Sequence, residues 1–407
     1  MVSVSDALKI MLDSVKPLQN QEEISILEAR GRVLAEDIFA AENIPPFNNS
    51  AMDGYALRSE DVKQAAKGDD VSLKIIGEIQ AGGDFQGKKI TQGTAIRIMT
   101  GAPMPDGADA VVMVEETREK DDFVYLARSI NKKENVRFAG EDLPKGGKVL
   151  DKGEVLKSAD IGLLASLNHQ KINVYPKPKV AIISTGDELV DLGVPLPPGK
   201  IRNSNAFTLY SEVLKYNGLP YYLGIAKDTK EATLKKIKEA LDYDIIITSG
   251  GVSMGQYDFV KEVLLDLGFD LKIKKIKMKP GKPLAFGVKG KSVFFGLPGN
   301  PVSTLIAFIE FVRPVLLKFM GNSSYEKPLV EAILDDELVK KPERLHFVRG
   351  CFRIKEGKIH VKVTGAQGSG ILKSMSKANC LIILKEGLKL VRQGELVPIQ
   401  LINHEEL

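Results

Sequence analysis

Several residue types are scarce in this chain, and each scarcity excludes a class of site. Tryptophan is absent, and the 407 residues include only two cysteines and four histidines. The cysteines lie far apart without a CxxC spacing, which argues against a disulfide framework and against a zinc site. The histidines show no HxxxH spacing, so a histidine-based metal site is not expected either.

Long apolar runs and a strong net charge are also missing. No stretch reaches the length of a membrane span, and no signal peptide is recognisable. The net charge is +4, from 57 basic and 53 acidic side chains, which is too small an excess to favour nucleic acid as a partner. We therefore expect a cytoplasmic protein that binds neither nucleic acid nor membrane.

The region between residues 179 and 320 has the strongest structural signal. Short, β-branched apolar runs without alternation predict strands buried on both faces of a parallel sheet, and helical patterns follow them. Such alternation is typical of a doubly wound, three-layer α/β domain. The predicted strands are 180–184, 220–226, 244–249 and 271–277 with a hairpin through 284–296, and the predicted helices are 205–217, 229–241, 258–268 and 301–320.

The flanking regions predict smaller domains. Short β-type runs broken by glycine fill residues 55–128, and only short strands and turns follow residue 328. Helices are predicted at 3–16, 22–39 and 158–167. The predicted domains are an elongated helical and linker domain at 1–45 with 143–176, a small β-domain at 46–142, the α/β domain at 177–327, and a C-terminal β-barrel-like domain at 328–407.

Three glycine-bearing turns, STGDEL, TSGGVSMG and LPGNP, end three of the predicted strands. Ligands of open α/β sheets bind at the carboxyl ends of the strands, so the turns should converge on one site. Small residues let backbone N–H groups approach an anion, which favours a phosphorylated ligand. For Ser253 a simple polar loop role is an equal alternative. The turn residues expected to bind substrate are Gly186, Asp187, Ser249, Gly250, Gly251, Ser253, Pro298, Gly299, Asn300 and Pro301.

Four carboxylates follow predicted strands or begin predicted helices at the same edge of the sheet. They are Asp187, Glu188, Asp228 and Asp258. Carboxylate oxygens suit Mg²⁺, which commonly bridges carboxylates and substrate phosphates. For any one of them, helix capping is an equally good explanation. The shared position of the set favours a metal–phosphate role.

Basic residues lie beside these turns in two motifs. In KPGKP, prolines on both sides of a Gly-Lys pair give a rigid turn in which Lys279 and Lys282 could hold a phosphate or an oxyanion. Lys275 precedes this motif, while the other lysines of the 271–283 run are expected to form a solvated strand edge. In KIRNSN, the planar fork of Arg202 fits a tetrahedral oxyanion, while Asn203 or Ser204 caps the following helix.

Outside the α/β domain, three residues stand in glycine-containing loops. Asp53 lies in SAMDGYA, Thr100 in MTGAP and Asp142 in RFAGED. By spacing alone, Asx-type turns explain all three, and their residue types assign no chemistry to them.

Nine segments in order nevertheless resemble the molybdopterin molybdenumtransferase family, whose animal version is the E domain of gephyrin. The resemblance spans nearly the whole chain. One segment alone would be weak, because TSGG also occurs in related adenylyltransferases, but nine in the family's order are specific. The segments are PPFNNSAMDGYA, GEIQAGG, IMTGAPMPDGADAVV, RFAGEDL, STGDEL, KIRNSN, TSGGVSMGQYD, KPGKP and LPGNPVS.

The resemblance implies a reaction: molybdate (or tungstate) is inserted into adenylylated molybdopterin, and Mg²⁺-dependent cleavage of the pyrophosphate link releases AMP. It implies metal ligation by Glu188, Asp228 and Asp258. The residues to which it gives catalytic roles are Asp53, Thr100, Asp142, Glu188, Asp228, Asp258, Lys275 and Lys279. The substrate-binding residues are the turn residues with Arg137, Arg202, Lys282, Arg349 and Ser369.

Family members are homodimers whose active site lies between subunits, which would explain why Asp53 is so far in sequence from the glycine turns. A molybdopterin adenylyltransferase is a further expected partner. Two positions depart from the family pattern, since Asn203 and Gln256 stand where relatives often carry acidic residues. The alternatives are an adenylyltransferase of the same α/β fold, a scaffold protein, and a molybdopterin carrier without catalysis.

Overall fold

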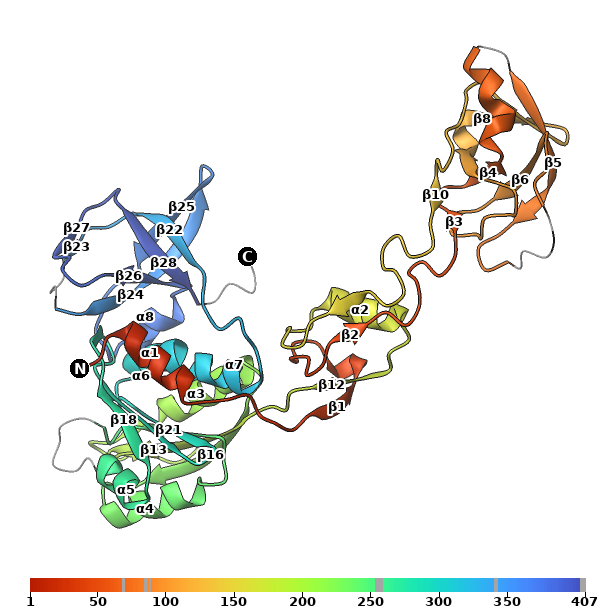
Figure 1. Ribbon diagram of the computed structural model, residues 1–407. Helices are drawn as coiled ribbons and strands as arrows, with labels where there is room; N and C mark the ends of the chain where they lie inside the picture. The colour runs from red at the N-terminus through yellow and green to blue at the C-terminus, as the bar shows by residue number, and fades with distance from the viewer. Residues whose placement is uncertain (68–69, 84–86, 88, 253–258, 340–342, 403–407) are drawn as a thin grey trace. The chain divides into compact units, whose positions relative to one another are not determined.

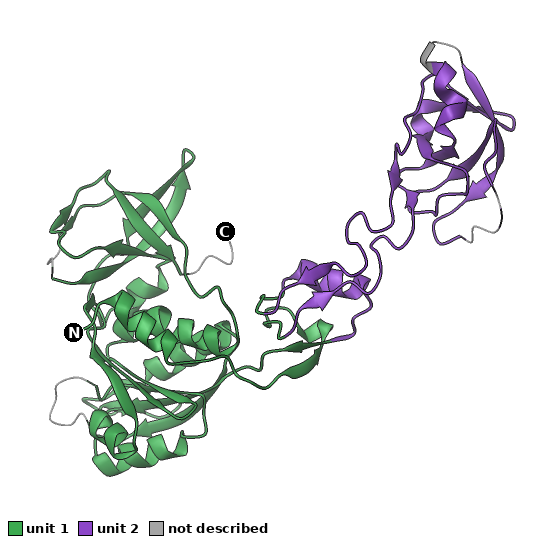
Figure 2. Ribbon diagram, in the orientation of Figure 1, with its two compact units in different colours: residues 1–35, 153–156, 172–407 green, residues 36–152, 157–171 purple. Residues whose placement is uncertain are grey.

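The computed structural model describes residues 1–67, 70–83, 87, 89–252, 259–339 and 343–402. The chain forms two compact units, each with its own hydrophobic cores (Figure 2). Unit 1 comprises residues 1–35, 153–156 and 172–407, and unit 2 comprises residues 36–152 and 157–171. The four predicted domain ranges stay predictions.

The largest sheet of unit 1 is the predicted α/β sheet, with strand order β16-β13-β17-β21-β20-β18. The strands β16, β13, β17 and β21 are parallel, and the hairpin β20–β21 together with β18 adds an antiparallel edge. Residues Ile245 to Ser249 are all buried, as their unalternating apolar sequence predicts. The strands are β13 (Lys179–Thr185), β16 (Leu219–Ala226), β17 (Ile245–Ser249), β18 (Asp270–Lys275), β20 (Pro283–Lys289) and β21 (Ser292–Leu297).

Helices cover both faces of this sheet (Figure 1). Val180 and Ile182 point into a core shared with α1, α3, α6 and α7, while Ala181 and Ile183 point into a core shared with α4 and α5. The predicted three-layer arrangement is therefore confirmed. The helices are α1 (Val4–Asp13), α3 (Ser204–Lys215), α4 (Lys230–Glu239), α5 (Val260–Asp266), α6 (Pro301–Ala307), the π-helix η4 (Phe308–Val312) and α7 (Arg313–Phe319).

The C-terminal part of unit 1 is a closed barrel. Strand pairs β24–β25, β25–β22, β22–β28, β28–β26 and β26–β24 form a ring around a core that includes Leu334, Val361 and Ile382. The short strand β19 joins this sheet by pairing with β24. The elements are β19 (Met278–Lys279), β22 (Leu329–Leu334), β23 (Leu338–Val339), β24 (Leu345–Lys355), β25 (Lys358–Val363), α8 (Leu372–Ser376), β26 (Cys380–Leu384), β27 (Leu390–Val391) and β28 (Leu396–Leu401).

Unit 2 is built around a six-stranded sheet of order β7-β4-β6-β5-β9-β8. Tyr55 and Leu57 of β4 face one core and Ala56 faces another, so this strand is covered on both sides. The elements are β4 (Gly54–Leu57), the 3₁₀ helix η2 (Ser59–Lys67), β5 (Val71–Ile79), β6 (Thr94–Ile98), β7 (Ala110–Met113), η3 (Val114–Glu116), β8 (Thr117–Lys120) and β9 (Phe123–Leu126), with β2 (Ile38–Phe39), β3 (Asn49–Ser50), β10 (Val136–Arg137), β11 (Lys148–Leu150) and α2 (Ser158–Ser166) outside the sheet.

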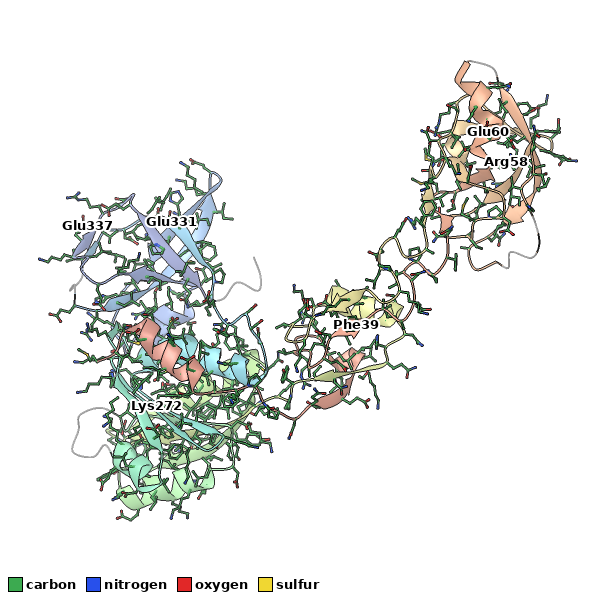
Figure 3. All side chains as sticks on the ribbon, viewed as in Figure 1. Phe39, Arg58, Glu60, Lys272, Glu331 and Glu337 are labelled. Carbon is green, nitrogen blue, oxygen red and sulfur yellow. The ribbon has the colours of Figure 1, made fainter. Side chains whose placement is uncertain are left out.

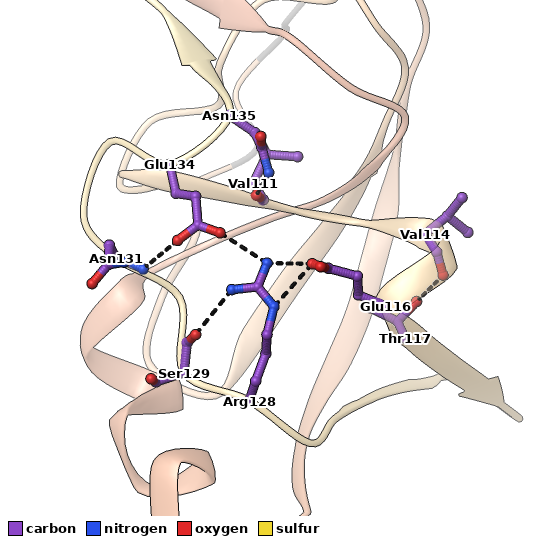
Figure 4. Close-up of polar contacts among 9 residues, drawn as sticks. All are labelled: Val111, Val114, Glu116, Thr117, Arg128, Ser129, Asn131, Glu134 and Asn135. Atoms are coloured by element: carbon purple, nitrogen blue, oxygen red, sulfur yellow. Dashed lines mark hydrogen bonds and ion pairs between the residues drawn. The ribbon is translucent and has the colours of Figure 1, made fainter.

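An ion-pair cluster around Arg128 closes the loop that follows β9 (Figure 4). The Arg128 guanidinium donates to Glu116, to Glu134 (Nη2 to Oε1, 2.8 Å) and to the Ser129 carbonyl at 3.1 Å. Glu134 in turn accepts the Asn131 backbone N–H at 2.9 Å. These hydrogen bonds lower the pKa of Glu134 and raise the pKa of Arg128. A long irregular loop is thereby fixed against the sheet of unit 2.

The predicted helix at 22–39 is wrong. Residues 22–25 form β1 (Glu22–Ser25), which pairs with β12 (Lys171–Val174), and η1 (Ile26–Glu28) is a single 3₁₀ turn capped by Ser25. Gly31 then adopts a positive φ of 77°, which interrupts any helix. Long-range strand pairing overrides the helical propensity of this glutamate- and leucine-containing segment. The helices predicted at 3–16 and 158–167 are present as α1 and α2.

Candidate functional site

The carboxyl ends of β13, β17 and β21 meet at a cleft of about 640 Å³ in unit 1. All three glycine turns line it, as their positions predict. Glu188, Arg202 and Asp228 line the same cleft. The turn residues brought together are Gly186, Ser249, Gly250, Gly251, Pro298, Gly299, Asn300 and Pro301.

Glycine is required in the first two turns. Gly186 has φ +143°, and a Cβ there would lie 2.3 Å from the Glu188 carboxylate. Gly250 has φ +98°, and its Cβ would lie 2.6 Å from the Thr185 carbonyl oxygen. The absence of side chains therefore lets Glu188 fold back against its own turn and lets the second turn pack on the first.

Asp187 and Asp228 fix the two loops that follow β13 and β16. The Asp228 carboxylate accepts the Asp187 backbone N–H at 3.1 Å, and the Asp187 carboxylate accepts the Asp228 backbone N–H at 3.3 Å. Asp187 is exposed and is not among the described residues that line the cleft. Its carboxylate is used to hold the loop, while Glu188 and Asp228 face the cleft.

Two predicted residues, Asp258 and Ser253, lie outside the described residues. Within the described ranges, no group of three or more His, Cys, Asp or Glu side chains is placed to hold a metal. The predicted metal set is therefore represented by Glu188 and Asp228, which share the cleft.

Asn203 does not cap the helix, contrary to the alternative offered by its sequence position. It is the N-cap residue of α3 but makes no capping hydrogen bond with its side chain. Instead it accepts the Ser184 hydroxyl at 2.8 Å and donates to the Tyr222 hydroxyl at 2.8 Å. Tyr222 donates to Asp191 at 2.5 Å, and burial together with this carboxylate raises the pKa of Tyr222.

Arg202 is fixed by the same segment. The short strands β14 (Leu189–Val190) and β15 (Ile201–Arg202) pair in parallel, and Arg202 Nη1 donates to the Asp191 carbonyl at 2.8 Å. Arg202 lines the cleft, as predicted. An adjacent buried network thus orients the predicted anion-binding guanidinium.

A second cavity of about 690 Å³ adjoins the cleft and shares Pro283 and Asn300 with it. The KPGKP segment supplies Lys279 and Lys282 to this cavity, and the loop before α8 supplies Ser369. The short pairing of β19 with β24 places Lys279 beside His346. Sequence reasoning missed four polar residues of this cavity: Ser303, which ends the LPGNPVS segment, and Arg344, His346 and Gln367, which lie in none of the nine segments.

Arg349 acts behind this cavity. It is 1% exposed, and its guanidinium donates to the carbonyls of Ala366 and Gly368 at 3.0 and 3.2 Å. Burial lowers the pKa of Arg349. The side chain therefore holds the loop that presents Ser369, rather than lining the cavity. Lys275, on β18, is also not among the described residues that line either cavity.

The predicted residues of unit 2 lie in its loops or on the short strand β10. Asp53 accepts both the backbone N–H and the hydroxyl of Thr100, each at 2.7 Å, and these bonds lower the pKa of Asp53. Arg137 lies on β10, opposite Asn49 of β3. Asp142 is exposed, and its backbone N–H donates to the Ile44 carbonyl at 3.1 Å. Asp53, Arg137 and Asp142 are all exposed and accessible to a ligand.

Comparison with known proteins assigns the family. The chain is 40% identical over 409 aligned positions, covering 99% of both chains, to the molybdopterin molybdenumtransferase of Haemophilus influenzae. The chain belongs to the molybdopterin molybdenumtransferase family. The Bacillus subtilis member is 35% identical over 94% of this chain and 90% of its own length. The resemblance carried by the nine segments is confirmed, and the chain is a transferase of molybdenum cofactor biosynthesis.

Family models and a solved structure agree along the chain. Residues 2–168 match the MoeA N-terminal region (domain I and II), residues 181–318 a probable molybdopterin binding domain, and residues 331–402 the MoeA C-terminal region (domain IV). The molybdopterin biosynthesis protein MoeA from Pyrococcus horikoshii superposes with a TM-score of 0.86 at 34% identity, covering 99% of this chain and 100% of that one. None of the helices within the described ranges has the length and apolarity of a membrane crossing.

The structure also adds residues to the site that were not among the predicted site residues of this molybdopterin molybdenumtransferase. Asn205 lines the cleft and contacts two of its turns, and it lies in the KIRNSN segment that was already recognised. Its position as the second residue of α3, shortly after the predicted site residue Arg202, could have identified it from the sequence. No sequence signal could have identified His346 and Arg344, because only the pairing of β19 with β24 places them beside Lys279.

Proposed function

We propose that this chain inserts molybdate into adenylylated molybdopterin, with cleavage of the pyrophosphate link and release of AMP. One observation carries the proposal: a cleft lined by two carboxylates and three glycine turns adjoins a separate cavity lined by two lysines. The first suits a metal-bound pyrophosphate and the second suits an oxyanion. A nucleotide-binding site alone would not need the second cavity.

Mg²⁺ fits the carboxylates of the cleft. Glu188 and Asp228 both face it, and Asp228 accepts only the Asp187 N–H among the described groups. Mg²⁺ keeps several waters and is commonly held by one or two carboxylates together with substrate phosphates. Glu188 and Asp228, with Asp258 as a further proposed ligand, would hold the ion. When bound, it would neutralise developing charge on the pyrophosphate.

The protein's own groups have distinct proposed roles. Backbone N–H groups of the turns at Gly250 and Gly299 cradle the phosphates, and Arg202 neutralises their charge. Lys279 and Lys282 hold molybdate or tungstate in the adjoining cavity. Water attacks the AMP phosphorus and the bridging P–O bond breaks, so AMP and the molybdopterin phosphate leave as separate products. The oxyanion metal bonds to the two dithiolene sulfurs of molybdopterin, and one of its oxo groups leaves as water with the two thiol protons.

We further propose that the active site is completed between two subunits of a homodimer. The supporting observation is that the motif residues fall into two separate groups, Asp53, Thr100, Arg137 and Asp142 in unit 2 and the cleft residues in unit 1. A molybdopterin adenylyltransferase would supply the adenylylated substrate. The proposed location is the cytoplasm.

Single-turnover experiments test the proposal directly. Adenylylated molybdopterin is mixed with enzyme and Mg²⁺, and AMP release is followed with molybdate, with tungstate and without either. We expect release that depends on the oxyanion, and release that is equal in all three arms would refute the insertion reaction. Incubation with ATP and molybdopterin separates the adenylyltransferase alternative, which alone would produce the adenylylated compound.

A further inference from the structure

Asn205, in the first turn of α3, bridges two of the glycine turns. Its side-chain Nδ2 donates to Ser249 Oγ at 2.7 Å and to the Gly299 carbonyl at 2.8 Å. Ser249 ends β17, and Gly299 lies in the turn after β21. Asn205 is the residue of α3 that ties the second turn to the third.

The Gly299 carbonyl fixes the orientation of the Asn205 amide. A carbonyl oxygen can only accept a hydrogen bond, so the amide must present its NH₂ group to Gly299 and not its oxygen. An NH₂ group has two hydrogens, and the two shorter contacts use both of them. A third acceptor, Thr304 Oγ1, is more distant at 3.4 Å.

The same orientation determines what the Ser249 hydroxyl can do. Because its oxygen accepts a hydrogen from Asn205, its own hydrogen must point elsewhere. Ser249 is 2% exposed and lines the cleft, and Asn205 is the hydrogen-bond partner that the described structure gives its Oγ. A hydroxyl that accepts a hydrogen bond also becomes a stronger donor. The hydrogen of Ser249 is therefore available to an acceptor in the cleft.

Helix α6 also holds the third turn, through its own hydrogen bonds. Thr304 Oγ1 donates to the Pro298 carbonyl and lies 3.1 Å from the Asn300 carbonyl. This contact anchors the turn but does not reach Ser249. Asn205 and Thr304 thus make separable contributions: both secure the third turn, and only Asn205 orients the Ser249 hydroxyl.

We propose that Asn205 is a positioning residue that holds the second and third turns together and directs the Ser249 hydroxyl to donate to a phosphate oxygen of the substrate. This role rests on the proposed function of the cleft. In this proposal the Ser249 hydroxyl donates a hydrogen bond to a phosphate oxygen. This contact is distinct from the hydrogen bonds that the backbone N–H groups of the glycine turns donate.

A double-mutant cycle tests the coupling between the two residues. AMP binding in the presence of Mg²⁺ is measured by calorimetry for the wild type, Asn205→Ala, Ser249→Ala and the double variant. We expect each single variant to weaken AMP binding roughly tenfold, and the double variant to bind about as weakly as the weaker single one. Fully additive losses would overturn the proposal.

Thr304→Val is the matched control. It removes an anchor of the third turn without touching Ser249, so its loss should add to that of Ser249→Ala. If Thr304→Val couples to Ser249→Ala as strongly as Asn205→Ala does, Asn205 has only a structural role. Should Asn205→Ala fail to fold, the isosteric Asn205→Asp replaces it in the cycle, since a carboxylate cannot donate to either partner.

Single-turnover kinetics give a second readout. Asn205→Ala should slow AMP release while the molybdate concentration for half-maximal rate stays the same, because the second cavity is lined by other residues. A changed molybdate dependence would contradict the proposal. A wild type that neither binds nor releases AMP overturns the proposed function together with this role, whereas an active wild type with additive losses overturns only this role.

Discussion

Two sets of charged residues in unit 1 are arranged in opposite ways. Glu188, in a loop at the cleft, and Lys279, at the end of β19 in the second cavity, are both exposed. Arg313 of α7 and Gln400 of the barrel are instead buried, and Glu310 of η4 and Lys327 beyond α7 are half-buried beside them; we call these four residues the buried polar cluster. Residues of the first set can contact a ligand, whereas residues of the second set contact other groups of the protein.

Burial acts on every ionisable member of the buried polar cluster. It raises the pKa of Glu310, lowers the pKa of Arg313, and lowers the pKa of Lys327 to about 8. Gln400 Nε2 donates to Glu310 at 2.7 Å, and Arg313 Nη1 donates to the Tyr325 carbonyl at 2.8 Å. These contacts join the π-helix η4 to the barrel. Charged side chains at the cleft can therefore bind a ligand. The polar side chains of the buried polar cluster instead hold the barrel against the α/β layers.

The largest expected effect is on chemistry and comes from the cleft. Glu188→Ala should lower the rate of AMP release roughly 100-fold, because it removes a proposed ligand of the Mg²⁺ ion that would neutralise charge on the pyrophosphate. The melting temperature should change by no more than about 2 °C, since Glu188 is exposed. Glu331→Ala, on the outer face of barrel strand β22, is the control (Figure 3). Unchanged AMP release in Glu188→Ala would refute its proposed role.

The next effect is on stability and comes from the buried polar cluster. Gln400→Leu leaves the buried Glu310 carboxyl without its donor, so the free energy of unfolding should fall by about 2 kcal/mol. Urea denaturation measures this loss. Gln80→Leu, at an exposed position of unit 2, should change the free energy of unfolding by less than about 0.5 kcal/mol. An equal loss of unfolding free energy in both variants would show that the hydrogen bond in the buried polar cluster does not stabilise the fold more than an exposed one.

Lys327 gives the cluster a pH signature. Its pKa is about 8 in the folded protein and about 10.4 when unfolded, so the unfolded chain binds more protons between these values. The contribution of Lys327 to the free energy of unfolding should therefore increase as the pH rises from about 8 to 10.4. Arg313, Glu310, Lys215 and Glu212 act electrostatically on it.

Replacing Lys327 with methionine isolates that contribution. Lys327→Met should be more stable than the wild type at pH 7, by a margin that shrinks as the pH approaches 10. Urea denaturation of both proteins at pH 7, 8, 9 and 10 measures the margin. Parallel curves would mean that Lys327 is solvated and that the cluster does not bury its charge.

The two sets also differ in how far the sequence predicts them. Glu188 and Gly250 lie in short motifs directly after apolar strands, and the geometry of a parallel sheet brings such turns together. Glu310 and Gln400 are 90 positions apart in unremarkable surroundings, and only the packing of the barrel on η4 joins them. Arg344 reaches the second cavity by the pairing of β19 with β24, which no local pattern encodes.

The errors follow the same division. Local propensity predicts a helix over residues 22–39, but the pairing of β1 with β12 and of β2 with β11 determines the structure at the two ends of this segment. Asn203 was assigned an alternative capping role from its place before a helix, but Tyr222 and Ser184, both distant in sequence, bind its side chain. Long-range proximity was predictable where the geometry of a parallel sheet dictates it, as for the three glycine turns, but individual side-chain contacts between distant segments were not.

The smallest expected effect concerns Asp53, an exposed, loop-borne carboxylate like Glu188 that nevertheless has fixed donors. Thr100→Val removes the hydroxyl donor but keeps the backbone N–H, so the pKa of Asp53 should rise part of the way toward its usual value. Titration of the carboxyl by NMR measures the change. The pKa of Asp37, which is lowered by Lys152 and Lys148, is an internal control that should not move.

The sign of the associated stability change follows from the lowered pKa. A carboxylate whose folded pKa lies below its unfolded value stabilises the fold above the unfolded pKa, and this contribution is lost as the pH falls through the folded pKa. Thr100→Val should therefore reduce the acid sensitivity contributed by Asp53. If the Asp53 pKa does not move, the backbone N–H of Thr100 suffices to fix this carboxylate, and exposed loop charges need no side-chain partner to be held in place.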